Sequence, residues 1–124
     1  MRILIVEDEV KIRMGISRLI TSHTHHTVVG EAKNGKEGLE MISRYHPQLV
    51  ISDIRMPVMN GLETAAAIRA GAKADAKTIP IIAMSANAFA EDMEKSRRAG
   101  MNRHVAKPVE PERLFGVLSE IFSD

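Results

Sequence analysis

Short apolar runs alternate with helix-like segments along this chain, and this alternation narrows the folds that it can adopt. The strand-like runs cover residues 2–6, 27–32, 49–52, 81–84 and 103–106. Between runs, apolar residues recur at helical spacing, as Ile12, Ile16 and Ile20 do after the first run. Repeated strand–helix units build a parallel sheet with helices on its faces. The sequence therefore predicts an α/β domain, a three-layer doubly wound fold with five strands and five helices.

The length and composition predict a single domain without an obvious charged partner. The chain has 124 residues, enough for one well-buried core, so we expect one domain over 1–124. Its 17 basic and 16 acidic residues give no case for binding nucleic acid or an anionic membrane. The absence of Cys excludes disulfides and thiolate metal sites. No apolar run approaches a bilayer span and no signal peptide is visible, so we expect a cytoplasmic protein.

Four of the strand-like runs stop at residues that can handle a phosphoryl group or a divalent cation. In chain order these residues are the pair Glu7 and Asp8, then Asp53, Ser85 and Lys107. One acidic residue after a strand is usually a helix cap or a turn former. However, the carboxyl ends of parallel strands lie at one edge of the sheet, where doubly wound folds bind ligands. The agreement of four strand ends therefore predicts one shared site.

The chemistry of these residue types fits phosphoryl transfer. Three carboxylates at one rim repel one another until a proton or a cation relieves the repulsion. An all-oxygen ligand set suits Mg²⁺ or Mn²⁺. Ser85 can donate a hydrogen bond to a phosphoryl oxygen, and Lys107 can pair with one as a point charge. Asp53 stands alone at its strand end, so it is the candidate nucleophile, with Glu7 and Asp8 left to hold metal.

The motifs that carry these residues match a known family. They are LIVEDE at 4–9, SDIRMP at 52–57 followed by Asn60-Gly61, MSA at 84–86, and the stretch from Gly100-Met101 to Lys107-Pro108. In this order they resemble the receiver domains of two-component response regulators, including the chemotaxis regulators, along essentially the whole chain. The resemblance implies a flavodoxin-like fold with strand order 2-1-3-4-5.

The resemblance also implies a reaction and a metal. Asp53 would accept a phosphoryl group from the phosphohistidine of a sensor histidine kinase or a histidine phosphotransfer domain. Mg²⁺ would be held by Asp8, Asp53 and the backbone carbonyl of Arg55, with Glu7 acting largely through water. The domain would phosphorylate and dephosphorylate itself and would not be an enzyme in any other sense.

Ser85 and Lys107 would contact the phosphoryl oxygens by the same resemblance, and the Lys107-Pro108 peptide bond would be cis. Ser85 would then move inward and pull on the segment that leads into a helix near 88–99, whose thin apolar face predicts weak docking. Family members usually carry Tyr or Phe three residues before the lysine, but this chain has His104. We expect His104 to report activation with weaker coupling or some pH dependence; the alternative is an exposed histidine with no switching role.

The family usually changes partners on the surface formed by helix 88–99, strand 103–106 and the terminal helix. Phe89 and Met93 are the apolar residues of the first of these helices. In the terminal helix the other apolar residues suffice to pack one face, which leaves Phe115 and Phe122 at its rim. These four residues are the predicted partner face, with a homodimer as one use of it. The alternative is a terminal helix that is simply deeply seated.

Other functional readings are weaker. A pseudo-receiver that only binds proteins is the main alternative, and the complete set of site residues argues against it. A Mg²⁺-dependent phosphatase usually has a second Asp shortly after its nucleophile, which the sequence after Asp53 does not offer. His23, His25 and His26 could bind a transition metal, but a solvated loop is favoured. The output and the cognate kinase stay open, with a domain excised from a longer protein as the expectation.

Overall fold

A computed structural model describes residues 1–54, 59–71, 76–85 and 90–122. Strands and helices alternate along the chain, as predicted. In order they are β1 (Arg2–Val6), α1 (Val10–His23), β2 (Thr27–Ala32), α2 (Gly35–Tyr45), β3 (Leu49–Asp53), α3 (Gly61–Arg69), β4 (Ile81–Ser85), α4 (Ala90–Arg98), β5 (Arg103–Ala106) and α5 (Pro111–Ile121). Among the described helices, none combines the length and apolar character needed to cross a membrane.

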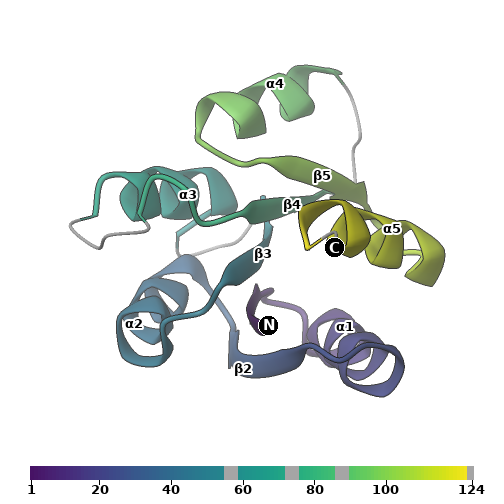
Figure 1. Ribbon diagram of the computed structural model, residues 1–124. Coiled ribbons are helices and arrows are strands. Elements are labelled where there is room, and N and C mark those ends of the chain that lie inside the picture. Colours follow the sequence, from purple (N-terminus) through teal and green to yellow (C-terminus); the bar gives the residue numbers. More distant parts are fainter. Residues whose placement is uncertain (55–58, 72–75, 86–89, 123–124) are drawn as a thin grey trace.

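The strands form one parallel sheet in the order β2-β1-β3-β4-β5, so the predicted fold class and strand order are confirmed. Helices α2 and α3 cover one face and α1 and α5 the other, while α4 lies beside β5 (Figure 1). Two apolar clusters fill the spaces between these layers. Alternate residues of each strand feed them: Leu4 of β1 points toward α2 and α3, and Ile5 toward α1 and α5. Both faces are covered, which explains the continuous apolar runs.

Strands β3 and β4 each run one residue further than the predicted runs 49–52 and 81–84. Asp53 still pairs with Met84, and Ser85 pairs with Ala106 of β5. The two polar residues are therefore the last members of the ladder rather than the first residues of a loop. Their backbones are fixed by the sheet, which positions both side chains at its carboxyl edge.

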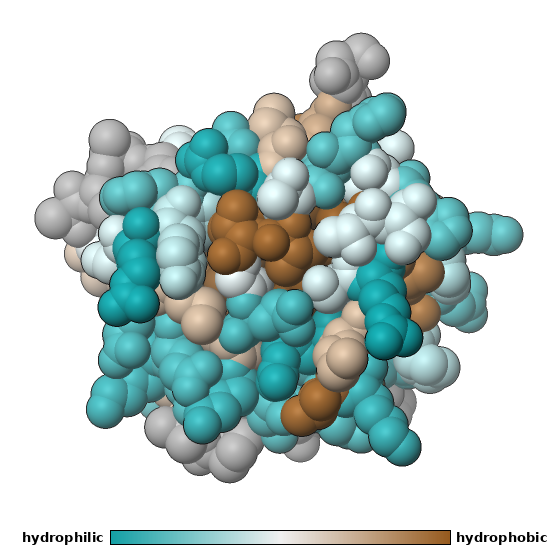
Figure 2. All heavy atoms as spheres, turned by 90° about the horizontal axis from the view of Figure 1, so that it is seen from below, coloured by the Kyte–Doolittle hydropathy of each residue, from teal (hydrophilic) through white to brown (hydrophobic). Residues whose placement is uncertain are grey.

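The β2 edge of the sheet carries a hydrophobic strip. Val28 and Val29 are half-buried there, and Tyr45 of α2 is 40% exposed. Figure 2 looks onto this side of the molecule, and hydrophobic residues gather near its centre within a mostly hydrophilic surround. Exposed Thr27 and Glu31 flank the strip along β2 and make this edge less suited to pairing with another strand.

Arg69, at the end of α3, fastens the connection between α4 and β5. Its guanidinium donates to the carbonyl oxygen of Gly100 from Nε at 3.1 Å and from Nη2 at 2.8 Å. It also donates to the carbonyl oxygen of Ala76 and to the side chain of Asn102. Gly100 has φ of 103°, which ends α4 in the left-handed conformation that favours glycine. The carboxyl end of α4 is thereby tied to α3.

The described side chains of α4 agree with the predicted thin apolar face. Met93 is 46% exposed, and Ser96 is the buried residue of the 93–98 segment. A helix that buries so little apolar surface gains little from docking on the sheet.

Candidate functional site

Three of the predicted site residues meet at the carboxyl edge of the sheet. The ammonium nitrogen of Lys107 lies 2.9 Å from Oδ2 of Asp53 and 2.7 Å from Oε1 of Glu7. Glu7 follows β1, Asp53 ends β3 and Lys107 follows β5, so residues far apart in sequence converge because their strands are parallel. The side chain of Lys107 is 15% exposed, which leaves the two ion pairs largely shielded from water.

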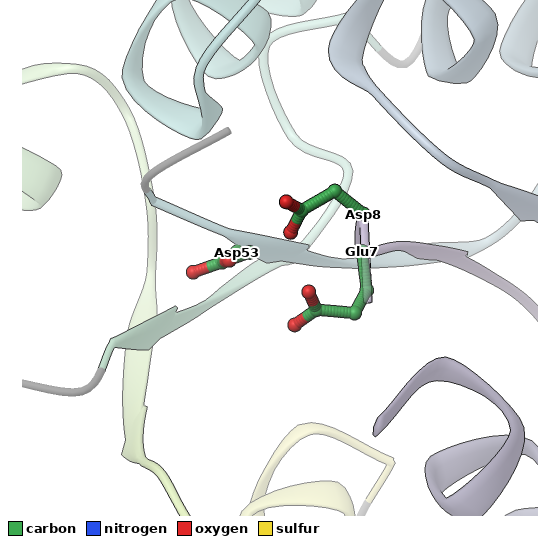
Figure 3. A group of neighbouring side chains, drawn as sticks. All are labelled: Glu7, Asp8 and Asp53. Carbon is green, nitrogen blue, oxygen red and sulfur yellow. The ribbon is translucent and has the colours of Figure 1, made fainter. Parts of the chain in front are cut away.

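Three carboxylates gather at this edge of the sheet, near the ammonium group of Lys107. Ligand oxygens of Glu7, Asp8 and Asp53 all lie within 4.8 Å of one another, the only such group among the described residues. Figure 3 shows them around the ends of β1 and β3. Glu7 and Asp53 are buried, whereas Asp8 is exposed. Clustered carboxylates, one of them open to solvent, fit Mg²⁺, which combines a few carboxylates with water and phosphate oxygens.

The electrostatics of the cluster depend on Lys107. Burial raises the pKa of Glu7, and the neighbouring charge of Asp53 adds to the rise, while Lys107 opposes it. Burial alone would lower the pKa of Lys107, but its hydrogen bonds to Glu7 and Asp53 outweigh that effect and raise it. Lys107 therefore stays protonated and supplies the positive charge that the buried acids need.

The peptide groups around Glu7 are held from several sides. Its N–H donates to the carbonyl of Ala32 at 2.9 Å, and its Oε2 accepts from the N–H of Glu9 at 3.0 Å. Its carbonyl oxygen accepts from Nη1 of Arg13 at 2.7 Å. The sequence does not point to Arg13, because a contact between an arginine side chain and a backbone carbonyl leaves no pattern in it.

Gly61 supports Asp53 from the start of α3. Its N–H donates to the carbonyl of Ile54 at 2.8 Å, and a Cβ at this position would lie 2.1 Å from the carbonyl oxygen of Asp53. Asn60 and Glu63 form a capping box that fixes where the helix begins. The Asn60-Gly61 motif was visible in the sequence, but the close approach that requires glycine was not.

Ser85 and the Lys107-Pro108 bond also lie where the sequence predicts. Ser85 is 2% exposed, and its carbonyl oxygen accepts from the N–H of Lys107 at 2.9 Å. The hydrogen bond ties the end of β4 directly to the lysine. The Lys107-Pro108 peptide is cis, as the resemblance implies.

His104 lies on β5 and is half-buried. Together with Met93 it lines a groove of about 620 Å³ between α4 and α5. Charged residues of both helices and of β5 line the same groove: Glu94, Arg97, Arg103, Glu112, Arg113 and Glu120. The predicted switch residue and one predicted partner-face residue therefore share a surface.

The placement of Phe115 and Phe122 on that surface is wrong. Their rings lie against His23 and His26, with centroid distances of 5.8 and 4.7 Å, on the flank of α5 that faces α1. A helical wheel places residues around a helix but does not tell which neighbour each flank meets, and α1 shares this face of the sheet with α5. His26 is half-buried against the ring of Phe122, so the expectation of a solvated loop is wrong for this histidine, whereas His23 and His25 are exposed. Among the described residues, no metal-binding group contains His23, His25 or His26.

Two predicted site residues cannot be compared with the structure. The backbone carbonyl of Arg55 and the side chain of Phe89 lie outside the described residues. The terminal helix itself is deeply seated, since Leu114, Val117 and Leu118 are buried.

Known proteins are similar to this chain in sequence and in fold. The model of the response regulator receiver domain matches residues 3–119. The chemotaxis protein CheY of Thermotoga maritima is 36% identical over 122 residues, 97% of this chain and 96% of that protein. The nitrate/nitrite response regulator NarL of Escherichia coli is 34% identical over 118 residues, 95% of this chain but 53% of NarL, so the chain spans about half the length of that relative.

Solved structures agree with the sequence relatives. The receiver domain of the sensor histidine kinase PA1611 from Pseudomonas aeruginosa superposes with a TM-score of 0.84 at 30% identity, covering 96% of this chain and 94% of that one. That structure holds a magnesium ion in its active site cleft. Chemotaxis protein CheY4 of Vibrio cholerae gives a TM-score of 0.89 at 27% identity, with 98% of each chain covered.

A receiver domain is a signalling module of two-component systems and not an enzyme with a separate substrate, as the sequence predicts. The acidic cluster of Glu7, Asp8 and Asp53 matches the position expected for the metal site of such a domain. The chain belongs to the response regulator receiver domain family.

Proposed function

We propose that this domain is a phosphorylation-activated switch in which Asp53 accepts a phosphoryl group from the phosphohistidine of a histidine kinase or a phosphotransfer domain. The observation that carries the proposal is the position of Lys107, 2.9 Å from Asp53, beside three carboxylates whose ligand oxygens lie within 4.8 Å of one another. An acceptor carboxylate, a counter-charge for phosphoryl oxygens and an oxygen-rich cation site are the parts that phosphoryl transfer requires.

The residues divide the work as follows. A carboxylate oxygen of Asp53 forms the new bond to phosphorus while the bond from phosphorus to the imidazole nitrogen breaks, and the electron pair stays on the imidazole. Lys107 pairs with one phosphoryl oxygen, and the hydroxyl of Ser85 donates a hydrogen bond to another. Hydrolysis later returns Asp53 to a free carboxylate and releases phosphate.

Glu7, Asp8 and Asp53 would hold Mg²⁺, joined by the backbone carbonyl of Arg55 as the family resemblance implies. Glu7 acts largely through water in this arrangement, because it already pairs with Lys107. When bound, the ion neutralises negative charge on the phosphoryl oxygens. The donor set supports Mg²⁺ over softer metals, since every ligand is oxygen.

The switch would be transmitted through the groove between α4, β5 and α5. A phosphoryl group adds negative charge and acceptor oxygens next to Ser85, whose movement would bias the thinly packed α4. His104 and Met93 line the groove at this point, so they are the residues we propose to change with the phosphorylation state. A protein partner or a second copy of this domain would read the change there.

The direct test is phosphorylation by acetyl phosphate in the presence of Mg²⁺, followed by intact-mass spectrometry. We expect one phosphoryl group per chain in the wild type and none in Asp53→Asn, because the amide is not a nucleophile. Beryllofluoride should perturb the amide resonances of the site in the wild type only. A wild type that takes up neither group is a pseudo-receiver, and rapid release of many phosphates per chain would indicate a phosphatase.

His104 is expected to make the response of α4 depend on pH. A protonated imidazole would place a positive charge among the acidic and basic residues of the groove, and histidine is the side chain that changes charge between about pH 5 and 8. We expect the beryllofluoride-induced change in hydrogen exchange of residues 93–98 to differ across this range in the wild type. The pH dependence should vanish in His104→Phe and persist in the control His25→Phe, an exposed histidine outside the groove. Equal pH dependence in wild type and His104→Phe would rule out a pH-dependent role for His104.

A further inference from the structure

Arg13, in the first part of α1, holds the backbone that carries the acidic pair. Its side chain is 16% exposed, and Nη1 donates to the carbonyl oxygen of Glu7 at 2.7 Å. On its other side, Nε lies 3.7 Å from Oε1 of Glu31 on β2. We propose that Arg13 is a positioning residue that orients the Glu7-Asp8 peptide and thereby directs Asp8 toward Mg²⁺. The inference rests on the proposed function, because it assigns a supporting residue to the same metal site.

The geometry of the peptide bond links Arg13 to Asp8. The Glu7 carbonyl belongs to the peptide plane that joins Glu7 to Asp8, and this plane is rigid. Fixing its oxygen fixes the N–Cα bond of Asp8, and so restricts the Cβ of Asp8 to the positions that rotation about this one bond allows. The preceding peptide is also fixed, since the N–H of Glu7 donates to Ala32 at 2.9 Å.

Asp8 needs this external support because its own side chain is exposed. Glu7 and Asp53 are buried and are held by Lys107, whereas packing does not hold the carboxylate of Asp8. Of the three proposed ligands, Asp8 is therefore the one whose position depends most on its backbone. Groups that hydrogen-bond to metal ligands and orient them contribute substantially to metal affinity.

The positive charge of Arg13 and its proposed positioning role should have opposite effects on Mg²⁺ affinity, and this makes the role testable. A cationic side chain beside a cation site repels Mg²⁺, so removing it would tighten binding if charge were its only contribution. If Arg13 positions Asp8, removing it should weaken binding in spite of the lost repulsion. The sign of the change in affinity separates the two roles.

The experiment is isothermal titration calorimetry of the unphosphorylated protein with MgCl₂. We expect Arg13→Met to raise the Kd for Mg²⁺ by about 10-fold. Arg18→Met removes the same charge from an exposed position further along α1 and should leave the Kd near the wild-type value. Arg13→Lys keeps the charge but loses the forked guanidinium, so it should also weaken binding.

Circular dichroism checks that each variant is folded, and Arg13→Lys replaces Arg13→Met in the comparison if the methionine variant does not fold. An unchanged or lower Kd in a folded Arg13 variant would overturn the positioning role while leaving the proposed function intact. A wild type that does not bind Mg²⁺ would instead overturn the proposed metal site, and the inference with it. The two failures are therefore distinguishable in one titration series.

Discussion

Lys107→Met is expected to lower the free energy of unfolding by about 3 kcal/mol in Mg²⁺-free buffer near neutral pH. Lys107 is the cation that pairs with both Glu7 and Asp53, and the side chain of Glu7 has no exposed surface. Methionine has a similar length, so the substitution removes the charge with little loss of packing. A buried carboxylate left without a partner is costly because it has been removed from water without compensation. Urea denaturation followed by circular dichroism measures the loss.

The cost should depend on pH in a defined direction. Burial already raises the pKa of Glu7 above its ordinary value of 4.5, and Lys107 opposes that rise, so the pKa climbs further without Lys107. A carboxyl whose pKa is higher in the folded state contributes stability below 4.5 that is lost as the pH rises through the folded value. The difference between Lys107→Met and wild type should therefore be small in acid and grow toward neutral pH.

Two further variants make this prediction specific to the ion pairs. Glu7→Gln combined with Lys107→Met should be less destabilised than the sum of the single variants, because no buried charge at Glu7 is then left unpaired. Lys36→Met removes an exposed lysine of α2 and should change stability by less than about 0.5 kcal/mol. Equal losses in Lys107→Met and Lys36→Met would contradict a structural role for the buried ammonium.

Gly61→Ala is expected to destabilise the domain by about 3 kcal/mol and to weaken Mg²⁺ binding. The new Cβ would lie 2.1 Å from the carbonyl oxygen of Asp53 and 2.9 Å from Cα of Ile54. Both neighbours are backbone atoms at the end of β3, which cannot rotate away as a flexible side chain would. Either α3 or the strand end that carries Asp53 must move. Thermal denaturation and a Mg²⁺ titration measure the two effects.

Gly116→Ala provides the matched control. Gly116 lies within α5, and a Cβ there would meet no heavy atom within 4 Å. Alanine is favoured over glycine inside a helix, so this variant should gain about 1 kcal/mol of stability. The same Gly→Ala change should therefore lower stability at position 61 and raise it at position 116. A stable Gly61→Ala variant with normal Mg²⁺ affinity would contradict the prediction and show that the backbone adapts.

The fold can be predicted from the sequence because the strand and helix periodicities depend only on residues that are close together in the chain. The alternation of strand and helix signals predicts the parallel sheet, and the rule for strand carboxyl ends predicts that Glu7, Asp53 and Lys107 meet. Strands β3 and β4 each end one residue later than the sequence predicts, at Asp53 and Ser85. Pairing with the neighbouring strand decides where each of them ends. These are the parts of the molecule for which nearest-neighbour patterns and general topology suffice.

Tertiary contacts explain what the sequence could not predict. The hydrogen bond from Arg13 to the Glu7 carbonyl and the close approach of Gly61 to Asp53 both involve backbone atoms. Backbone atoms are the same in every residue, so the sequence carries no signal of these contacts. The helical spacing places Phe115 at the correct rim position of its helix but does not tell which helix that rim meets. Its side of α5 meets His23, so only the arrangement of helices on the sheet decides which surface it serves.

The bonds from Arg69 to Gly100 and Asn102 have a mechanical consequence for signalling. They anchor α4 at its carboxyl end, which makes that end a fulcrum. A helix anchored in this way moves as a lever, and its displacement grows with distance from the anchor. If Ser85 moves on phosphorylation as proposed, its pull would act on the far end, where the lever arm is longest. The guanidinium of Arg69 would thus set the axis of such a movement, although it belongs neither to the acidic site nor to the groove.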